Sequence, residues 1–158
     1  MARHSSRLQQ ELKQRRPFRS IYQEAALSVL KTADLIRREL ARRLESHDVT
    51  PQQYNVLRIL RGAGVEGLPT LSIAERLIEE APGMTRLLDR LEAKGLVRRV
   101  RCEQDRRQVL CYLAGEGARV LDALEPAVKE TERDLSLRLT QGEAESLVEL
   151  LEKMRERE

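Results

Sequence analysis

The chain has 158 residues, which is enough for one domain with a buried core and an appended helical part. Aromatic residues make up 3% of it and tryptophan is absent, which argues against a single-strand binder that stacks bases on aromatic rings. The net charge is only +3, but residues 84–115 carry eight cations against four anions, and residues 116–158 carry seven against twelve. This distribution predicts a nucleic-acid partner at one end of the fold and a different partner at the other.

The N-terminal part divides into a polar arm and a long helix. Residues 1–19 are basic and hold too few apolar side chains to support a helix, so they are interpreted as a mobile arm. The alternative is an arm that adds phosphate contacts or packs on a partner subunit. A capping box at Ser20 and Gln23 predicts a helix from Ser20 to about Ser46. Its wide apolar face favours packing on more than its own domain.

The next segment contains a second capping box, in residues 50–53, with proline at the first helical position. The predicted helix runs to about Gly62 and is followed by a glycine-rich turn. Residues 68–69 are predicted to form a minimal edge strand. A further helix should begin at residues 70–72 and end near Glu80.

The stretch from Met84 to Leu113 organises the rest of the chain. Its first part predicts a helix, because four apolar side chains recur at spacings of three and four: Met84, Leu87, Leu88 and Leu91. Gly95 follows Lys94 at the expected helix end. Two alternating segments, 96–101 and 109–113, then predict a hairpin around a charged turn. Two helices joined by a tight turn and followed by a hairpin form a winged helix-turn-helix.

The cations of this stretch flank the predicted helix and hairpin instead of forming one run. A major groove admits an α-helix, and base edges meet the first residues of the second helix of such a motif. We therefore predict DNA binding. The alternative is that these arginines only solvate the surface of the hairpin.

Two more helices are predicted after the hairpin. The first opens at residues 114–117 and runs to about Leu139, and Pro126 inside it predicts a kink. A capping box at Thr140 and Glu143 starts the last helix.

The run TRLLDRLEAKGLVRR at 85–99, the Asp-Arg-Arg sequence at 105–107 and the strand 109–113 resemble the MarR family of bacterial winged-helix transcriptional regulators. The capped segment 50–57 matches the second helix of that family. The resemblance implies a mainly α fold with a small antiparallel β-hairpin, a winged helix-turn-helix with long N- and C-terminal dimerisation helices. The parts it implies are a basic arm (1–19), a dimerisation helix (20–48), a DNA-binding domain (49–113) and C-terminal dimerisation helices (114–158).

The same resemblance implies a function. It is that of a homodimeric repressor on a palindromic operator, with a recognition helix in each major groove and a wing in the minor groove. A small aromatic or anionic effector would release it. Carried over by position, Thr85 and Arg86 are recognition-helix contacts, Arg107 is the wing-tip arginine, and Asp105 orients it.

Arg90 and the hairpin cations are assigned to phosphates or to ion pairs within the domain. The predicted DNA-binding set is therefore Thr85, Arg86, Arg90, Arg98, Arg99, Asp105, Arg106 and Arg107. Two departures from the family pattern concern helix starts. Residues 80–83 lack the usual small polar cap before the recognition helix, and Ala114 stands where a capping threonine is common.

Other readings of single residues remain open. Tyr22 and Tyr54 either line an effector crevice or are core residues with a solvated hydroxyl. Cys111 should be a packed small hydrophobe, whereas Cys102 would be the sensor of a redox-responsive regulator. A protein-interaction module without DNA binding would need apolar side chains on the outer face of residues 84–94, which carries polar ones.

No catalytic, cofactor or metal site is predicted. The sequence offers no nucleophile–base pair and no phosphate-binding glycine loop, and His4 and His47 are too few and too far apart for a metal site. The two cysteines fit no disulfide framework or zinc-ligand spacing. No apolar run approaches a membrane span and no signal-peptide pattern opens the chain, so we expect a cytoplasmic protein.

Overall fold

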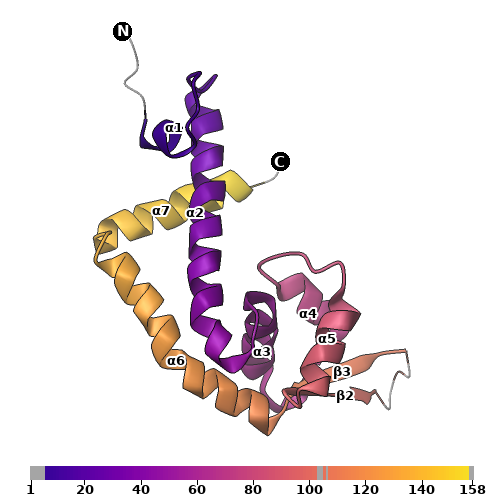
Figure 1. The fold of residues 1–158 in the computed structure, drawn as a ribbon. Coiled ribbons are helices and arrows are strands. Elements are labelled where there is room, and N and C mark those ends of the chain that lie inside the picture. The colour runs from indigo at the N-terminus through magenta and orange to yellow at the C-terminus, as the bar shows by residue number, and fades with distance from the viewer. Residues whose placement is uncertain (1–5, 103–104, 106, 157–158) are drawn as a thin grey trace. The chain divides into compact units, whose positions relative to one another are not determined.

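The computed structural model describes residues 6–102, 105 and 107–156 (Figure 1). These residues belong to two compact units, which divide between Glu39 and Leu40. Among them, no helix has both the length and the apolar content that crossing a membrane requires. The mainly helical architecture with a small antiparallel sheet is confirmed.

The first unit holds a short helix, α1 (Arg7–Glu11), and most of a long one, α2 (Ile21–Leu44). Helix α1 differs from the arm expected there. Ser6 caps it, because the Gln9 N–H donates to Ser6 Oγ at 3.2 Å. The start of α2 is confirmed, since the Gln23 N–H donates to Ser20 Oγ at 3.1 Å.

The second unit begins with the last turn of α2 and contains the remaining elements in chain order: η1 (Glu45–His47), α3 (Pro51–Ala63), η2 (Gly64–Glu66), β1 (Leu68–Pro69), α4 (Thr70–Arg76), α5 (Met84–Ala93), β2 (Val97–Arg101), β3 (Val109–Leu113), α6 (Gly115–Ser136) and α7 (Gln141–Arg155). The three strands form one antiparallel sheet in the order β1-β3-β2. Leu68 of β1 and Arg99 of β2 both pair with Cys111 of β3. The hairpin and the minimal edge strand are therefore confirmed.

Local signals place the start of α3. The Gln53 N–H donates to Thr50 Oγ1 at 3.2 Å, and Gln53 Oε1 accepts from the Thr50 N–H at 3.1 Å. This is the reciprocal capping box that the sequence predicts. Val49 and Tyr54, on either side of the cap, are both buried in the core, as a hydrophobic staple requires.

Helix α4 ends four residues before the position expected for it, at Arg76 instead of near Glu80. Leu77 is extended, with φ −68° and ψ 143°. The Ile78 N–H donates to the side-chain oxygen of Asn55 on α3, at 3.0 Å. A side chain from another helix thus replaces the next intrahelical hydrogen bond, which no local pattern around Glu80 could indicate.

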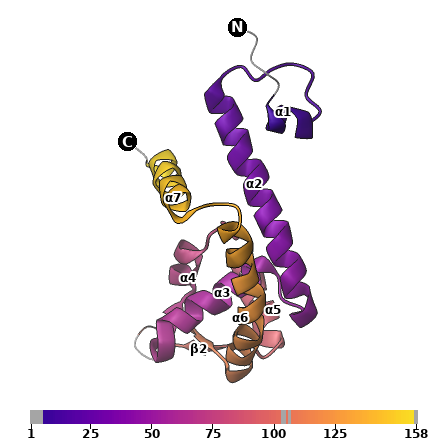
Figure 2. The same ribbon diagram turned by 90° about the vertical axis from the view of Figure 1, so that its left-hand side faces the viewer.

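The core lies where α3, α4, α5, the hairpin and α6 meet, and α6 packs against α3 (Figure 2). All four apolar side chains of the α5 stripe are buried, as predicted. Helix α5 ends in a Schellman motif, in which Gly95, at φ +69°, donates to the Glu92 carbonyl and Leu96 to the Leu91 carbonyl. This motif turns the chain directly from α5 into β2.

The junction between β3 and α6 is close-packed. The Ala114 N–H donates to the Leu96 carbonyl at 3.0 Å. A side chain at Gly117 would collide with that carbonyl and would lie 2.8 Å from Leu113 Cδ1. Glycine at position 117 therefore allows α6 to approach the base of the hairpin, although α6 has no side-chain cap at Ala114.

Helices α6 and α7 meet at a bend (Figure 1). Helix α6 continues past Pro126 to Ser136, and the kink at the proline stays a prediction. The predicted capping box of α7 is confirmed, because the Glu143 N–H donates to Thr140 Oγ1 and Glu143 Oε2 accepts from the Thr140 N–H.

Candidate nucleic-acid interface

The solvent face of α5 is polar and mostly cationic. Because its four apolar residues point into the core, Thr85, Arg86, Asp89 and Arg90 are turned outward and exposed. Arg86 and Arg90 are four residues apart, so both project from the same face of the helix. Within the described part of the chain, neither arginine forms an ion pair. Both guanidinium groups are available to an external anion.

The N-terminus of α5 also favours binding of an external anion. Gly83 is its N-cap, and no side chain caps the first turn among the described residues. This agrees with the departure noted in residues 80–83. The first amide groups of a helix bind anions readily, because they lack intrahelical acceptors and lie at the positive end of the helix dipole.

The two adjacent arginines of β2 serve opposite faces of the hairpin, because side chains alternate along a strand. The Arg98 guanidinium lies 4.1 Å from the ring centroid of its cross-strand neighbour Tyr112, an arrangement that permits a cation–π interaction. Arg99, on the other face, donates to Glu92 Oε2 and to Asp89 Oδ1 of α5. Arg98 is exposed, whereas the side chain of Arg99 is only 23% exposed.

The turn of the wing is held by Asp105. Its carboxylate accepts from the backbone N–H of Arg107 at 3.0 Å, and its carbonyl accepts from the Gln108 N–H at 2.9 Å. The Arg107 side chain is exposed. Asp105 therefore acts on Arg107 through the backbone, as an aspartate in a turn commonly does. Arg106, also in the predicted set, lies outside the described residues.

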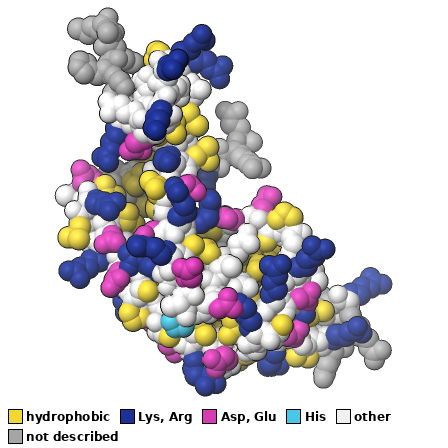
Figure 3. Space-filling view, viewed as in Figure 1, with side chains coloured by type: hydrophobic (Ala, Val, Ile, Leu, Met, Phe, Trp, Pro, Cys, Tyr) yellow, Lys and Arg dark blue, Asp and Glu magenta, His cyan; other side chains and the backbone are white. Residues whose placement is uncertain are grey.

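Figure 3 shows Lys and Arg side chains, with some acidic ones between them, over the part of the molecule that carries α5 and the hairpin. Two features there go beyond the sequence analysis. One is the identity of the partners of Arg99, Asp89 and Glu92, since only an unspecified ion pair within the domain was offered for the hairpin cations as an alternative to phosphate contacts. The other is the ion pair at 2.8 Å between Lys94 Nζ and Asp48 Oδ2, which ties the end of α5 to the loop before α3. The i, i+3 spacing of Asp89 and Glu92 was the available signal for the first.

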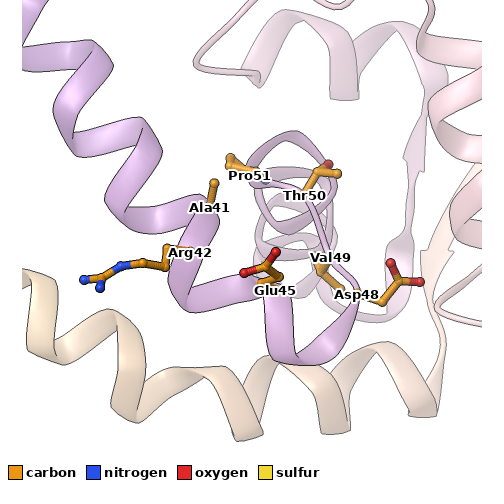
Figure 4. Close-up of a pocket in the computed structure, with 7 residues that line it drawn as sticks. All are labelled: Ala41, Arg42, Glu45, Asp48, Val49, Thr50 and Pro51. Carbon is orange, nitrogen blue, oxygen red and sulfur yellow. The ribbon is translucent and has the colours of Figure 1, made fainter.

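A pocket of about 300 Å³ lies between the last turn of α2 and the start of α3 (Figure 4). Its lining combines charged and small side chains: Ala41, Arg42, Glu45, Asp48, Val49, Thr50 and Pro51. Neither tyrosine of the predicted crevice lines it. Tyr54 is 9% exposed and belongs to the core, whereas Tyr22 is 83% exposed on the part of α2 in the other unit.

The cysteines differ in their surroundings. Cys111 is buried at the centre of the sheet, and burial raises the pKa of its thiol, so it is a packed hydrophobe as expected. Cys102 is half-buried at the end of β2, where its N–H donates to the Gln108 carbonyl. Its redox role stays a prediction. Among the described residues, no cluster of His, Cys, Asp and Glu could hold a metal ion.

Comparison with known proteins agrees with this arrangement. The model of the MarR family matches residues 49–109. The transcriptional regulator HosA of Escherichia coli O157:H7 is 31% identical over 110 residues, which cover 70% of this chain and 80% of HosA. The homoprotocatechuate degradative operon repressor of E. coli is 28% identical over 109 residues, covering 69% of this chain and 72% of the repressor.

The fold has solved counterparts. A MarR mutant from E. coli, crystallised in complex with operator DNA, superposes with a TM-score of 0.76 at 28% identity and covers 83% of this chain and 93% of its own. The residues matched by the family model include α3, α4, α5 and β2, and reach the first residue of β3. This family contains regulators of transcription and not enzymes. The chain belongs to the MarR family of winged-helix transcriptional regulators.

Proposed function

We propose that this protein is a homodimeric repressor that binds a palindromic operator through α5 and the wing and is released by a small effector. The observation that carries the proposal is the outer face of α5. All four apolar side chains of α5 are buried in the core. Thr85, Arg86 and Arg90, on the opposite face of the helix, are therefore exposed beside a cationic hairpin. In a winged helix this surface enters the major groove.

Within that interface the residues take different roles. Thr85 and Arg86, in the first turn of α5, contact base edges, and Arg90 contacts a phosphate. Arg107 enters the minor groove from a turn that Asp105 holds. Arg98, which lies over the ring of Tyr112, contacts the phosphate backbone of the DNA. That a relative of the same fold was crystallised with operator DNA supports DNA binding, while the individual roles rest on where the side chains lie in this chain.

Dimerisation by the outer helices is supported by their exposed apolar side chains. Helix α7 has no buried residue in the described chain, and Leu147, Val148, Leu150 and Met154 are 44–61% exposed on it. Ile21, Leu30 and Leu35 are 50–65% exposed on α2. A second copy of the chain would cover such surfaces. The dimer would then present two cationic interfaces to the two halves of a palindrome.

The repressor assignment rests on the relative named as an operon repressor. For the effector we propose the pocket of Figure 4. Asp48 lines that pocket and also holds Lys94 at the end of α5. A ligand that draws Asp48 away from Lys94 would loosen the recognition helix, which gives the effector a physical route to the operator.

The proposal is tested by selecting bound sites from random duplex DNA with the purified full-length protein. The expected result is a palindrome whose half-sites are about one helical turn apart. Two copies of residues 84–115 bring about +8 to the DNA, so affinity for the selected duplex should fall steeply with salt. Failure to enrich any sequence, or enrichment of a single unrepeated half-site, would contradict the proposal.

The wing is tested separately by Arg107→Ala. Loss of one specific contact should weaken binding to the selected operator by about 1–3 kcal/mol in a gel-shift titration. Arg119→Ala, at an arginine of α6 whose side chain is 78% exposed, is the matched control and should bind as the wild type does. If Arg107→Ala binds the operator as tightly as the wild type, the wing does not contribute to the interface through Arg107.

A further inference from the structure

Arg99 differs from Arg86 and Arg90 of the proposed interface in that its side chain forms ion pairs within the protein. Its Nε and one terminal nitrogen lie 2.9 and 2.7 Å from Glu92 Oε2, and the same terminal nitrogen lies 2.5 Å from Asp89 Oδ1. The Arg99 backbone N–H also donates to Glu92 Oε1 at 3.0 Å. Four hydrogen bonds thus join the middle of β2 to two successive acids of α5.

The position of Asp89 gives this cluster a consequence for DNA binding. Asp89 is on the outward face of α5 with its side chain 51% exposed, between Arg86 and Arg90 in the sequence. A carboxylate at that place would repel an approaching phosphate backbone. The Arg99 guanidinium reaches Asp89 from the neighbouring strand and offsets part of this charge, because Glu92 shares the same guanidinium.

The cluster also fixes the position of the wing (β2 and β3) relative to the recognition helix α5. Arg99 is on the same strand face as Val97, which is buried, and that face packs toward α5. Its hydrogen bond to Glu92 raises the pKa of Arg99 and lowers that of Glu92, so both groups stay charged at neutral pH. A planar guanidinium bound at two nitrogens holds its partners in a defined orientation.

We propose that Arg99 is a positioning residue for operator binding: it masks the Asp89 carboxylate on the DNA-facing side of α5 and joins the wing to the recognition helix without touching DNA. This inference rests on the proposed function, because it requires that α5 meets the operator. Of the two alternatives that the sequence left open for Arg99, a phosphate contact or an ion pair within the domain, it takes the second and adds a role in operator binding.

The test measures binding of fluorescent operator duplex, chosen by the wild-type selection, to the full-length protein and five variants. Arg99→Met should weaken binding about tenfold, a typical effect of losing one positioning interaction. Asp89→Asn alone should bind within about twofold of the wild type, because the Asp89 charge is already masked. The double variant should recover most of the loss caused by Arg99→Met.

Arg90→Met is the matched control for a lost phosphate contact. It should reduce the slope of log affinity against log salt by about one, and adding Asp89→Asn should not restore its binding. The slope for Arg99→Met should equal that of the wild type. If Arg99→Met instead reduces the slope and gains nothing from Asp89→Asn, Arg99 contacts phosphate and the inference is wrong.

Circular-dichroism melting checks that each variant folds. If Arg99→Met does not fold, Arg99→Gln replaces it, because glutamine keeps a hydrogen-bond donor and loses the charge. Its loss should also be recovered by Asp89→Asn, and a loss that is not recovered overturns the inference. A wild-type protein that selects no operator would overturn the proposed function itself, a result distinct from normal operator binding by Arg99→Met, which would overturn this inference alone.

Discussion

Helices α5 and α7 obtain their stability from opposite sources. Helix α5 has ten residues and no side-chain cap at its start, yet four of its side chains are buried. Helix α7 has fifteen residues and a complete capping box, yet none of its described side chains is buried. The difference shows that α5 is held by packing within its own chain, whereas α7 has a strong local start and an apolar face that its own chain leaves exposed.

The largest expected effect is on the packing of α5. Leu88 is fully buried at its centre, so Leu88→Ala should lower the free energy of unfolding by about 2–5 kcal/mol, measured by urea denaturation. Leu150→Ala on α7, a leucine 61% exposed within the chain, is the control. Measured at a protein concentration where the chains are monomeric, it should cost much less. Equal losses in both variants would remove the contrast between the two helices.

A smaller effect is expected where α6 packs onto the chain that follows α5. Gly117→Ala places a methyl group against the Leu96 carbonyl and Leu113, and should cost about 1–3 kcal/mol in the same denaturation experiment. Gly115→Ala is the control in the same helix, since a side chain there meets nothing within 4 Å. If Gly117→Ala is as stable as Gly115→Ala, Leu96 and Leu113 at the base of the hairpin can move away from the added methyl group at little energetic cost.

The apolar face of α7 is tested by its effect on association. Leu150→Asp places a charge on that face and should raise the dissociation constant of the proposed dimer at least about tenfold, measured by sedimentation velocity. Glu149→Ala, at an exposed polar neighbour, should leave association unchanged. A Leu150→Asp protein that sediments as the wild type does would place the contact between copies elsewhere.

The smallest effect concerns the contact between α5 and β2. The hydrogen bond from Arg99 lowers the pKa of Glu92, so ionised Glu92 stabilises the folded state at pH values above the ordinary glutamate value of 4.5. This contribution is lost as the pH falls through the lowered pKa of the folded state. Glu92→Gln should therefore melt a few degrees below the wild type at pH 7, and the gap should close in acid. A gap independent of pH would show that the charge of Glu92 contributes nothing.

The sequence predicted those parts of the fold that depend on local signals. The capping boxes at Thr50 and Thr140, the buried stripe of α5 and the hairpin strands are all confirmed. The end of α4 was misplaced, because it depends on a hydrogen bond that the Ile78 N–H donates to the side chain of Asn55 on another helix. Of the adjacent arginines in β2, alternation predicts opposite faces, but only tertiary structure shows that one of them meets Asp89 and Glu92.

The hydrogen bond from the Ile78 N–H to Asn55 also bears on which changes the connection between α4 and α5 would tolerate. Asn55 accepts a hydrogen bond at the point where the chain leaves α4. The start of the connection formed by residues 79–83 is therefore held in place by α3, and not by the side chains of the connection itself. Insertions or substitutions in that connection could shift or retilt the recognition helix while α3 and α4 stay in register. If α5 meets the operator as proposed, a change in this turn would alter operator preference at little cost to the core.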